Sequence, residues 1–135
     1  MRKVVLDTNC LIASLSSKSE NFQVWRALQR GMYILCVSNE ILEEYHEVIA
    51  RLTTSEIADN VLATLVESEF VEFFDPRFHL ELIKVDPDDN KFVDCAFVAN
   101  ATYIVSNDSH FDVLSKIDFP KILVLHLDEF LRTLK

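Results

Sequence analysis

Short apolar runs that alternate with amphipathic segments are the feature that most constrains the fold of this chain. Runs such as Val4-Val5-Leu6 and Ile122-Leu123-Val124-Leu125 are apolar at every position. A strand with one wet face would instead alternate apolar and polar residues. Continuous runs separated by helices predict a parallel sheet that is covered on both faces. We therefore expect an α/β fold: a three-layer α/β/α sandwich with a central, mostly parallel sheet.

The residue patterns also give approximate bounds for these elements. We expect strands at residues 3–7, 33–37, 70–74, 102–106 and 122–127. We expect helices at 21–30, 39–52, 55–68, 86–100, 109–116 and 129–134. Gly31 should end the first helix, and Ser38, Asp86 and Asp128 should cap later ones.

The composition fits one domain that spans residues 1–135. One Gly and three Pro leave little room for linkers. Cys10, Cys36 and Cys95 lie among apolar residues without Cys-x-x-Cys spacing, so we expect buried, reduced thiols in a cytoplasmic protein. No N-terminal signal sequence is visible and the apolar runs are too short to cross a bilayer, so we expect no membrane partner.

The net charge of −9 limits how the protein can bind polyanions. Non-specific binding to nucleic acid depends on Lys and Arg displacing counterions, and here 22 acids outnumber 13 basic residues. A protein of this charge that handles nucleic acid needs a metal ion, a local basic patch or a partner. Arg26 and Arg30 share one helix face, and Lys18, Lys91 and Lys116 lie in segments that can rim a crevice.

Four acids lie where separate chain segments end or turn inward: Asp7, Glu44, Asp89 and Asp108. Asp7 and Asp108 follow expected strands, and parallel sheets bind ligands beyond the carboxyl ends of their strands. Glu44 lies at the border of the apolar stripe of its helix, and Asp89 lies in the middle of the stripe of the helix at 86–100. Asp94 falls away from that stripe, which makes it a second-rank candidate.

A cluster of carboxylates with few matching cations is costly to bury and implies a divalent metal ion. Oxygen ligands without His or Cys favour Mg²⁺ or Mn²⁺ over Zn²⁺, and such a site suits phosphate chemistry. Each acid also has an ordinary structural explanation. Asp7 can form an Asx turn and Asp108 can cap a helix, while Asp89 can interact with a helix dipole and Glu44 can be a solvated helix-edge residue.

Four sequence blocks resemble those of PIN-domain proteins of the VapC-type toxin class. They are Val4-Val5-Leu6-Asp7-Thr8-Asn9, Ser38-Asn39-Glu40-Ile41-Leu42-Glu43-Glu44, Asp86-Pro87-Asp88-Asp89-Asn90-Lys91-Phe92 and Tyr103-Ile104-Val105-Ser106-Asn107-Asp108. The blocks follow the family's order and are near its spacing. Many members have an Asp just before a Phe in the last block; this chain has His110 there, and Asp108 matches the alternative placement.

The resemblance implies a metal-dependent endoribonuclease that hydrolyses RNA phosphodiesters with Mg²⁺ or Mn²⁺, as the toxin of a toxin–antitoxin pair. By position, Asp7, Glu44, Asp89 and Asp108 match the family's catalytic, metal-binding acids, and Thr8, Asn9 and Ser106 match its supporting polar residues. We add Asp94 to the supporting residues. The resemblance also implies an antitoxin partner and a homodimer.

Two other functions stay open at this point. Another Mg²⁺-dependent phosphohydrolase would use a nucleophilic Asp with a second acid close by in sequence, and Asp7-Thr8-Asn9 has no adjacent acid. A PIN-like fold can also serve as a catalytically silent protein-binding module. The sequence contains no Gly-rich phosphate loop, no Gly-x-Ser-x-Gly elbow and no histidines at zinc spacing.

Overall fold

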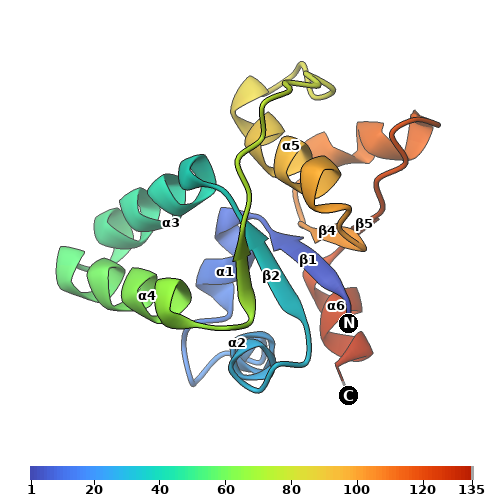
Figure 1. Cartoon of the computed structure of the whole chain (residues 1–135). Coiled ribbons are helices and arrows are strands. Elements are labelled where there is room, and N and C mark those ends of the chain that lie inside the picture. Colours follow the sequence, from blue (N-terminus) through green and yellow to red (C-terminus); the bar gives the residue numbers. More distant parts are fainter. Residues whose placement is uncertain (135) are drawn as a thin grey trace.

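A parallel β-sheet forms the centre of the computed structural model, which describes residues 1–134 (Figure 1). Its strands are β1 (Lys3–Leu6), β2 (Ile34–Val37), β3 (Val71–Phe73), β4 (Tyr103–Val105) and β5 (Val124–Leu125). They lie in the order β3-β2-β1-β4-β5, and each neighbouring pair is parallel. Because Leu6 pairs with Val105, the chain leaves β1 and β4 at the same place on the sheet edge.

Helices cover both faces of this sheet, as expected. They are α1 (Thr8–Ala13), α2 (Phe22–Gln29), α3 (Asn39–Leu52), α4 (Ser55–Glu67), α5 (Asn90–Ala99) and α6 (Leu127–Thr133), with 3₁₀ segments η1 (Pro87–Asp89) and η2 (Ser109–Lys116). Helix α5 packs across β1, β2 and β4 and lies above them in Figure 1, while α1 and α6 lie below and behind the strands. Helices α3 and α4 pack side by side. The predicted three-layer fold is confirmed.

The buried side chains of strands and helices form one hydrophobic core. The last three residues of β1 are fully buried, which is typical of a strand covered on both faces. On the α6 side, Phe130 lies edge-on against Tyr33 and Tyr103, with ring centroids 5.1 and 5.8 Å away. The Tyr33 hydroxyl donates to the Val24 carbonyl at 2.7 Å, which ties α2 to the start of β2.

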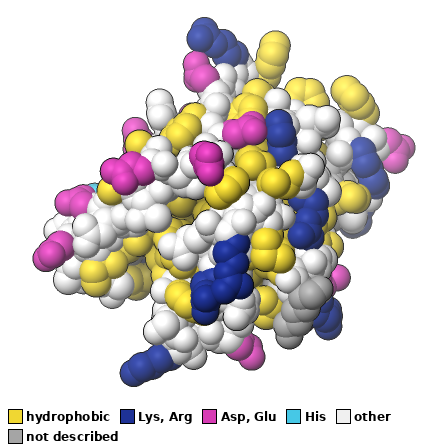
Figure 2. All heavy atoms as spheres, turned by 60° about the horizontal axis from the view of Figure 1, so that its bottom comes forward, with side chains coloured by type: hydrophobic (Ala, Val, Ile, Leu, Met, Phe, Trp, Pro, Cys, Tyr) yellow, Lys and Arg dark blue, Asp and Glu magenta, His cyan; other side chains and the backbone are white. Residues whose placement is uncertain are grey.

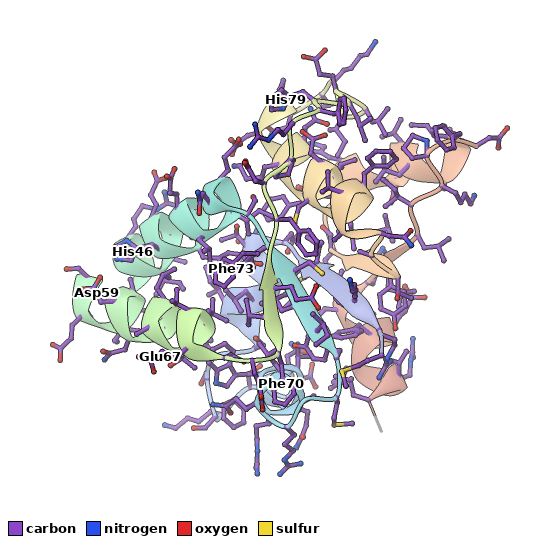
Figure 3. All side chains as sticks on the ribbon, in the orientation of Figure 1. His46, Asp59, Glu67, Phe70, Phe73 and His79 are labelled. Atoms are coloured by element: carbon purple, nitrogen blue, oxygen red, sulfur yellow. The ribbon has the colours of Figure 1, made fainter. Side chains whose placement is uncertain are left out.

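Gly31 ends α2 as the sequence predicts. Its φ of +74° lies in the left-handed region, which favours glycine. A Cβ atom at this position would also lie 2.6 Å from the ring of Phe70, which is labelled beside α2 in Figure 3. Both the backbone and the packing therefore require a residue without a side chain.

The structure contains one helix that the sequence does not predict. Residues 8–13 form α1, where no helix is expected from the sequence. Asp7 causes this helix to begin, because its carboxylate accepts a hydrogen bond from the Cys10 amide at 2.8 Å and so caps the first turn. The same residue thus ends β1 and begins α1.

Two later helices also begin differently from the prediction. The helix expected at 86–100 starts as a 3₁₀ turn and becomes α-helical at Asn90. The last helix is preceded by His126 rather than capped by Asp128. The Glu129 carboxylate accepts a hydrogen bond from the His126 amide at 2.9 Å, which fixes the earlier start.

The three cysteines are free and buried, as expected. Burial raises the pKa of Cys36 to about 11 and that of Cys95 to about 12, so both thiols stay protonated at neutral pH. Within residues 1–134, the helices are too short or too polar to cross a membrane.

Candidate functional site

A hollow of about 350 Å³ opens beyond the carboxyl ends of the strands. Its lining consists of Asp7, Thr8, Asn9, Glu44, Glu47, Val48, Arg51, Asp86, Asp88, Asp89, Phe92 and Asp108, and we call it the acidic hollow. Seven of these twelve residues are acids and one is a cation. The four acids selected from the sequence, Asp7, Glu44, Asp89 and Asp108, all line it, although they come from four separate chain segments.

The opposite end of the molecule has a different character. Figure 2 views the face at the bottom of Figure 1, where the strands begin. Lys and Arg side chains stand there among hydrophobic ones over the lower half of the view. The negative charge of the chain is therefore unevenly distributed, with seven of its 22 acids around a single hollow.

Asp7 is the most deeply placed of the four acids. The residue is 7% exposed, and one carboxylate oxygen accepts the Cys10 amide. The other oxygen accepts a hydrogen bond from the hydroxyl of Ser106, which is fully buried after β4. The Ser106 oxygen in turn accepts the Asp108 amide at 3.0 Å. Ser106 thus fixes the position of Asp7 relative to the chain that carries Asp108.

Glu44 is held by donors on both of its oxygens. The Thr8 hydroxyl donates to one oxygen, and the Lys91 ammonium donates to the other at 2.6 Å. Tyr45 anchors this part of α3, because its buried hydroxyl donates to the Leu6 carbonyl at 2.6 Å. The end of β1 therefore sets the height of Glu44 above the sheet.

Lys91 bridges two acids at the rim of the hollow. Its ammonium also donates to Asp88 at 2.8 Å, and its side chain is only 10% exposed. Burial lowers the pKa of Lys91, but its hydrogen bonds to Asp88 and Glu44 outweigh burial and raise the pKa above its usual value. The hydrogen bond from Lys91 lowers the pKa of Asp88. Lys91 and Asp88 are therefore both charged at neutral pH.

His110 lies between the remaining two acids. Its Nδ1 atom is 3.1 Å from Asp89 and 3.5 Å from Asp108. Burial raises the pKa of Asp89, and the hydrogen bond with His110 opposes that shift. The pKa of His110 is raised, chiefly by its hydrogen bond to Asp89. The histidine that replaces an acid of the family pattern therefore faces the predicted ligands.

The donor atoms fit a hard divalent cation. Ligand atoms of Asp86, Asp89 and His110 all lie within 4.8 Å of one another, and carboxylate oxygens predominate around the hollow. The sequence-based ligand set contained no histidine, so a nitrogen donor is an addition from the structure. Mn²⁺ accepts imidazole nitrogen more readily than Mg²⁺ does, and both metals suit the oxygen donors.

Asp94 lies outside the acidic hollow. It is more buried than Asp89, the reverse of the sequence-based expectation. Asp94 is 5% exposed and accepts the Leu80 amide at 3.0 Å, with His79 at 3.3 Å. Asp89, expected in the middle of the apolar stripe, is only partly buried. Asp89 precedes the regular α-helix, which begins at Asn90, so a helical wheel does not place it. Asp94 is buried because residues 79–83 pack against its side of α5.

The sequence reading missed several residues of the hollow, and Arg51 is the most informative. Glu44, Val48 and Arg51 lie at helical spacing along α3 and line the hollow together, a pattern visible in the sequence once Glu44 is selected. Arg51 is exposed and has no carboxylate within 4.0 Å among residues 1–134. His46 lies on the same helix but pairs with Asp59 of α4 at 2.7 Å (Figure 3).

The fold and this site define the class to which the protein belongs. The family model described as PIN domain matches residues 3–110, so the chain belongs to the PIN domain family. A search of curated proteins finds no match.

Three solved structures are similar to the chain. A crystal structure of VapBC2 from Rickettsia felis, bound to a DNA fragment from its promoter, has a TM-score of 0.64 and 15% identity, and the match covers 92% of this chain and 98% of that chain. DNA-bound VapBC from Salmonella typhimurium gives 0.59 and 18%, with 94% and 99% covered. The PIN domain endonuclease Utp24 gives 0.54 and 18%, with 92% and 84% covered. At these identities the likeness establishes the fold.

Proposed function

We propose that this protein is a metal-dependent endoribonuclease and the toxin of a toxin–antitoxin pair. One observation carries the proposal: Asp7, Glu44, Asp89 and Asp108, distant in the sequence, line one hollow at the carboxyl ends of the strands of a PIN domain. Seven acids around this hollow would repel an RNA phosphate unless a cation compensated them. A divalent metal ion supplies that compensation.

The residues of the hollow would have separate roles in binding the metal ion and orienting its ligands. Asp7, Glu44, Asp89 and Asp108 would hold Mg²⁺ or Mn²⁺, and Ser106 and Thr8 would orient two of these carboxylates through the hydrogen bonds they already make. When bound, the ion supplies Lewis acidity and neutralises charge for the attack of water on the phosphodiester. Asn9, which lines the hollow, would orient water or an RNA oxygen.

Arg51 would position the RNA. It lines the same hollow as the acids and extends from α3 two helical turns beyond Glu44. Its guanidinium has no carboxylate partner within residues 1–134, which suits it to bind a phosphate next to the one that is cleaved. We therefore assign Arg51 to substrate binding rather than to the chemical step.

The fold and the charge of the hollow support an antitoxin partner. Two of the similar structures are VapBC complexes bound to DNA, and this chain has a similar fold over most of its length. An acidic hollow is complementary to a basic segment of an antitoxin, which would cover the site. We also propose that the chain forms a single nuclease domain over residues 1–135, that it assembles as a homodimer and that it acts in the cytoplasm.

A cleavage assay tests the proposed activity. The purified chain should cut single-stranded RNA with Mg²⁺ or Mn²⁺, lose this activity in EDTA and regain it when metal is restored. Parallel reactions with single-stranded DNA and a generic phosphate ester separate a ribonuclease from another phosphohydrolase. If no substrate is cleaved at any metal concentration, the protein is a binding module and the nuclease proposal is wrong.

A further inference from the structure

Lys91 occupies an unusual place for a lysine, because it contacts an acid of a hollow that we propose binds a metal ion. It lies in the first turn of α5, and its ammonium contacts Glu44 of α3 at 2.6 Å and Asp88 of η1 at 2.8 Å. Only 10% of its side chain is exposed, compared with 71% for Asp88. The ion pair with Glu44 therefore spans two elements and is largely shielded from solvent.

The four selected acids differ in how their charge is compensated. Glu44 has a cation in direct contact, and Asp89 and Asp108 face His110. Asp7 receives hydrogen bonds from neutral donors, and no Lys, Arg or His nitrogen lies within 4.0 Å of it among residues 1–134. Among the four selected acids, within residues 1–134, Glu44 is thus the one that a permanently charged side chain contacts directly.

An ammonium and a divalent ion cannot share one carboxylate without cost. If Glu44 binds a metal ion, the two positive centres lie on the same side chain and repel each other through a partly buried medium. The same ammonium stabilises the hollow when no metal is present, because it offsets the mutual repulsion of Glu44, Asp88 and their acidic neighbours.

We propose that Lys91 is a built-in competitor of the divalent cation, which weakens metal binding and holds the metal-free hollow together. This inference rests on the proposed metal-dependent function. Lys91 is a positioning residue, since it acts through Glu44 and is not itself among the residues that line the hollow. It sets the metal concentration at which the site fills, so that the folded protein persists when the cation is scarce.

Calorimetric titration with MnCl₂, without RNA, tests the proposal on the full chain. Lys91→Met should bind Mn²⁺ about tenfold more tightly than wild type or better, because the competing charge is gone. Lys91→Arg keeps the charge and should bind like wild type. Lys84→Met, which removes an exposed lysine outside the hollow, is the matched control and should also bind like wild type. Equal or weaker binding by Lys91→Met would overturn the proposal.

Thermal unfolding provides a second readout that does not depend on activity. In EDTA, Lys91→Met should melt below wild type, and Mn²⁺ should raise its melting temperature by more than it raises that of wild type. If Lys91→Met does not fold, Lys91→Gln removes the charge and keeps a hydrogen-bond donor for the same comparison. An unchanged melting temperature in EDTA would contradict the stabilising role of Lys91.

The outcomes also separate this inference from the proposed function. If wild-type protein neither binds Mn²⁺ nor cleaves RNA, the proposed function itself fails. If wild-type protein does both, and Lys91→Met shows unchanged affinity, only the role of Lys91 is wrong.

Discussion

Two regions lie on either side of the start of α5, and their acidic side chains have different partners. One is the acidic hollow, and the other is the contact between α5 and residues 79–83, which we call the strap. In the strap, Asn90 donates to the Ile83 carbonyl at 2.8 Å and accepts its amide at 2.9 Å, while Asp94 accepts the Leu80 amide at 3.0 Å. Each of these polar groups has a neutral backbone partner.

In the hollow, by contrast, the acids face one another. Asp7, Glu44, Asp89 and Asp108 share one solvent-accessible space with three further acids and one arginine. Asp94 is as buried as Asp7, at 5% against 7% exposed, yet it makes a structural contact. Burial of a carboxylate therefore does not identify a functional site; the convergence of several carboxylates without enough cations does.

Asp7→Asn should have the largest effect on catalysis. The variant removes one negative charge from the hollow, and its side-chain oxygen can still accept the Cys10 amide, so the fold should persist. We expect the rate of RNA cleavage to fall by at least about 100-fold, because metal assistance contributes several kcal/mol. Asp118→Asn, which changes an exposed acid outside the hollow, is the control. Cleavage at the wild-type rate would show that Asp7 is not catalytic.

Ser106→Ala tests whether the support of Asp7 matters. It removes the donor to the Asp7 carboxylate and the acceptor of the Asp108 amide. We expect cleavage to fall by about 10- to 100-fold, the usual effect of losing a group that orients a metal ligand. Ser14→Ala is a matched control, because Ser14 is equally buried but donates to the Leu11 carbonyl in α1. Equal losses in both variants would indicate a general effect on folding.

Arg51→Ala should have a smaller and more selective effect. If Arg51 contacts a phosphate outside the reacting bond, its loss should raise KM about 3- to 10-fold and leave kcat nearly unchanged. The measurement is steady-state cleavage of a short RNA at two salt concentrations, and the variant should depend less on salt. Arg26→Ala, on α2 outside the hollow, should behave like wild type. A change in kcat alone would place Arg51 in the chemical step.

Asp94→Ala should have the smallest effect on catalysis and the clearest effect on stability. It leaves the partly buried Leu80 amide without its acceptor, which costs about 1 kcal/mol of unfolding free energy. Urea denaturation measures this loss, and kcat/KM of the folded fraction should stay near the wild-type value. If activity falls as steeply as in Asp7→Asn while stability is unchanged, the distinction between the two regions is wrong.

Much of this architecture could be predicted from local patterns. The apolar runs at residues 3–7 and 33–37 became β1 and β2, and Gly31 and Ser38 mark helix boundaries as expected. Asp7 and Asp108 were selected because parallel strands deliver their carboxyl ends to one edge. Asp89 and Asp94 could not be ranked this way, because Asp89 lies in a 3₁₀ turn before the regular helix and Asp94 is covered by a segment that packs against α5.

Local sequence patterns were enough to predict the order of the strands and most of the helices, the burial of the sheet on both faces and four of the acids that meet beyond it. These follow from the periodicity of apolar residues and the chemistry of individual side chains, which are local properties. Packing of the whole chain was needed to show that Lys91 pairs with Glu44, that His110 faces Asp89 and that Asp94 binds the strap. These contacts join residues that are 14 to 47 positions apart in the sequence. Such pairings depend on how whole elements pack against one another.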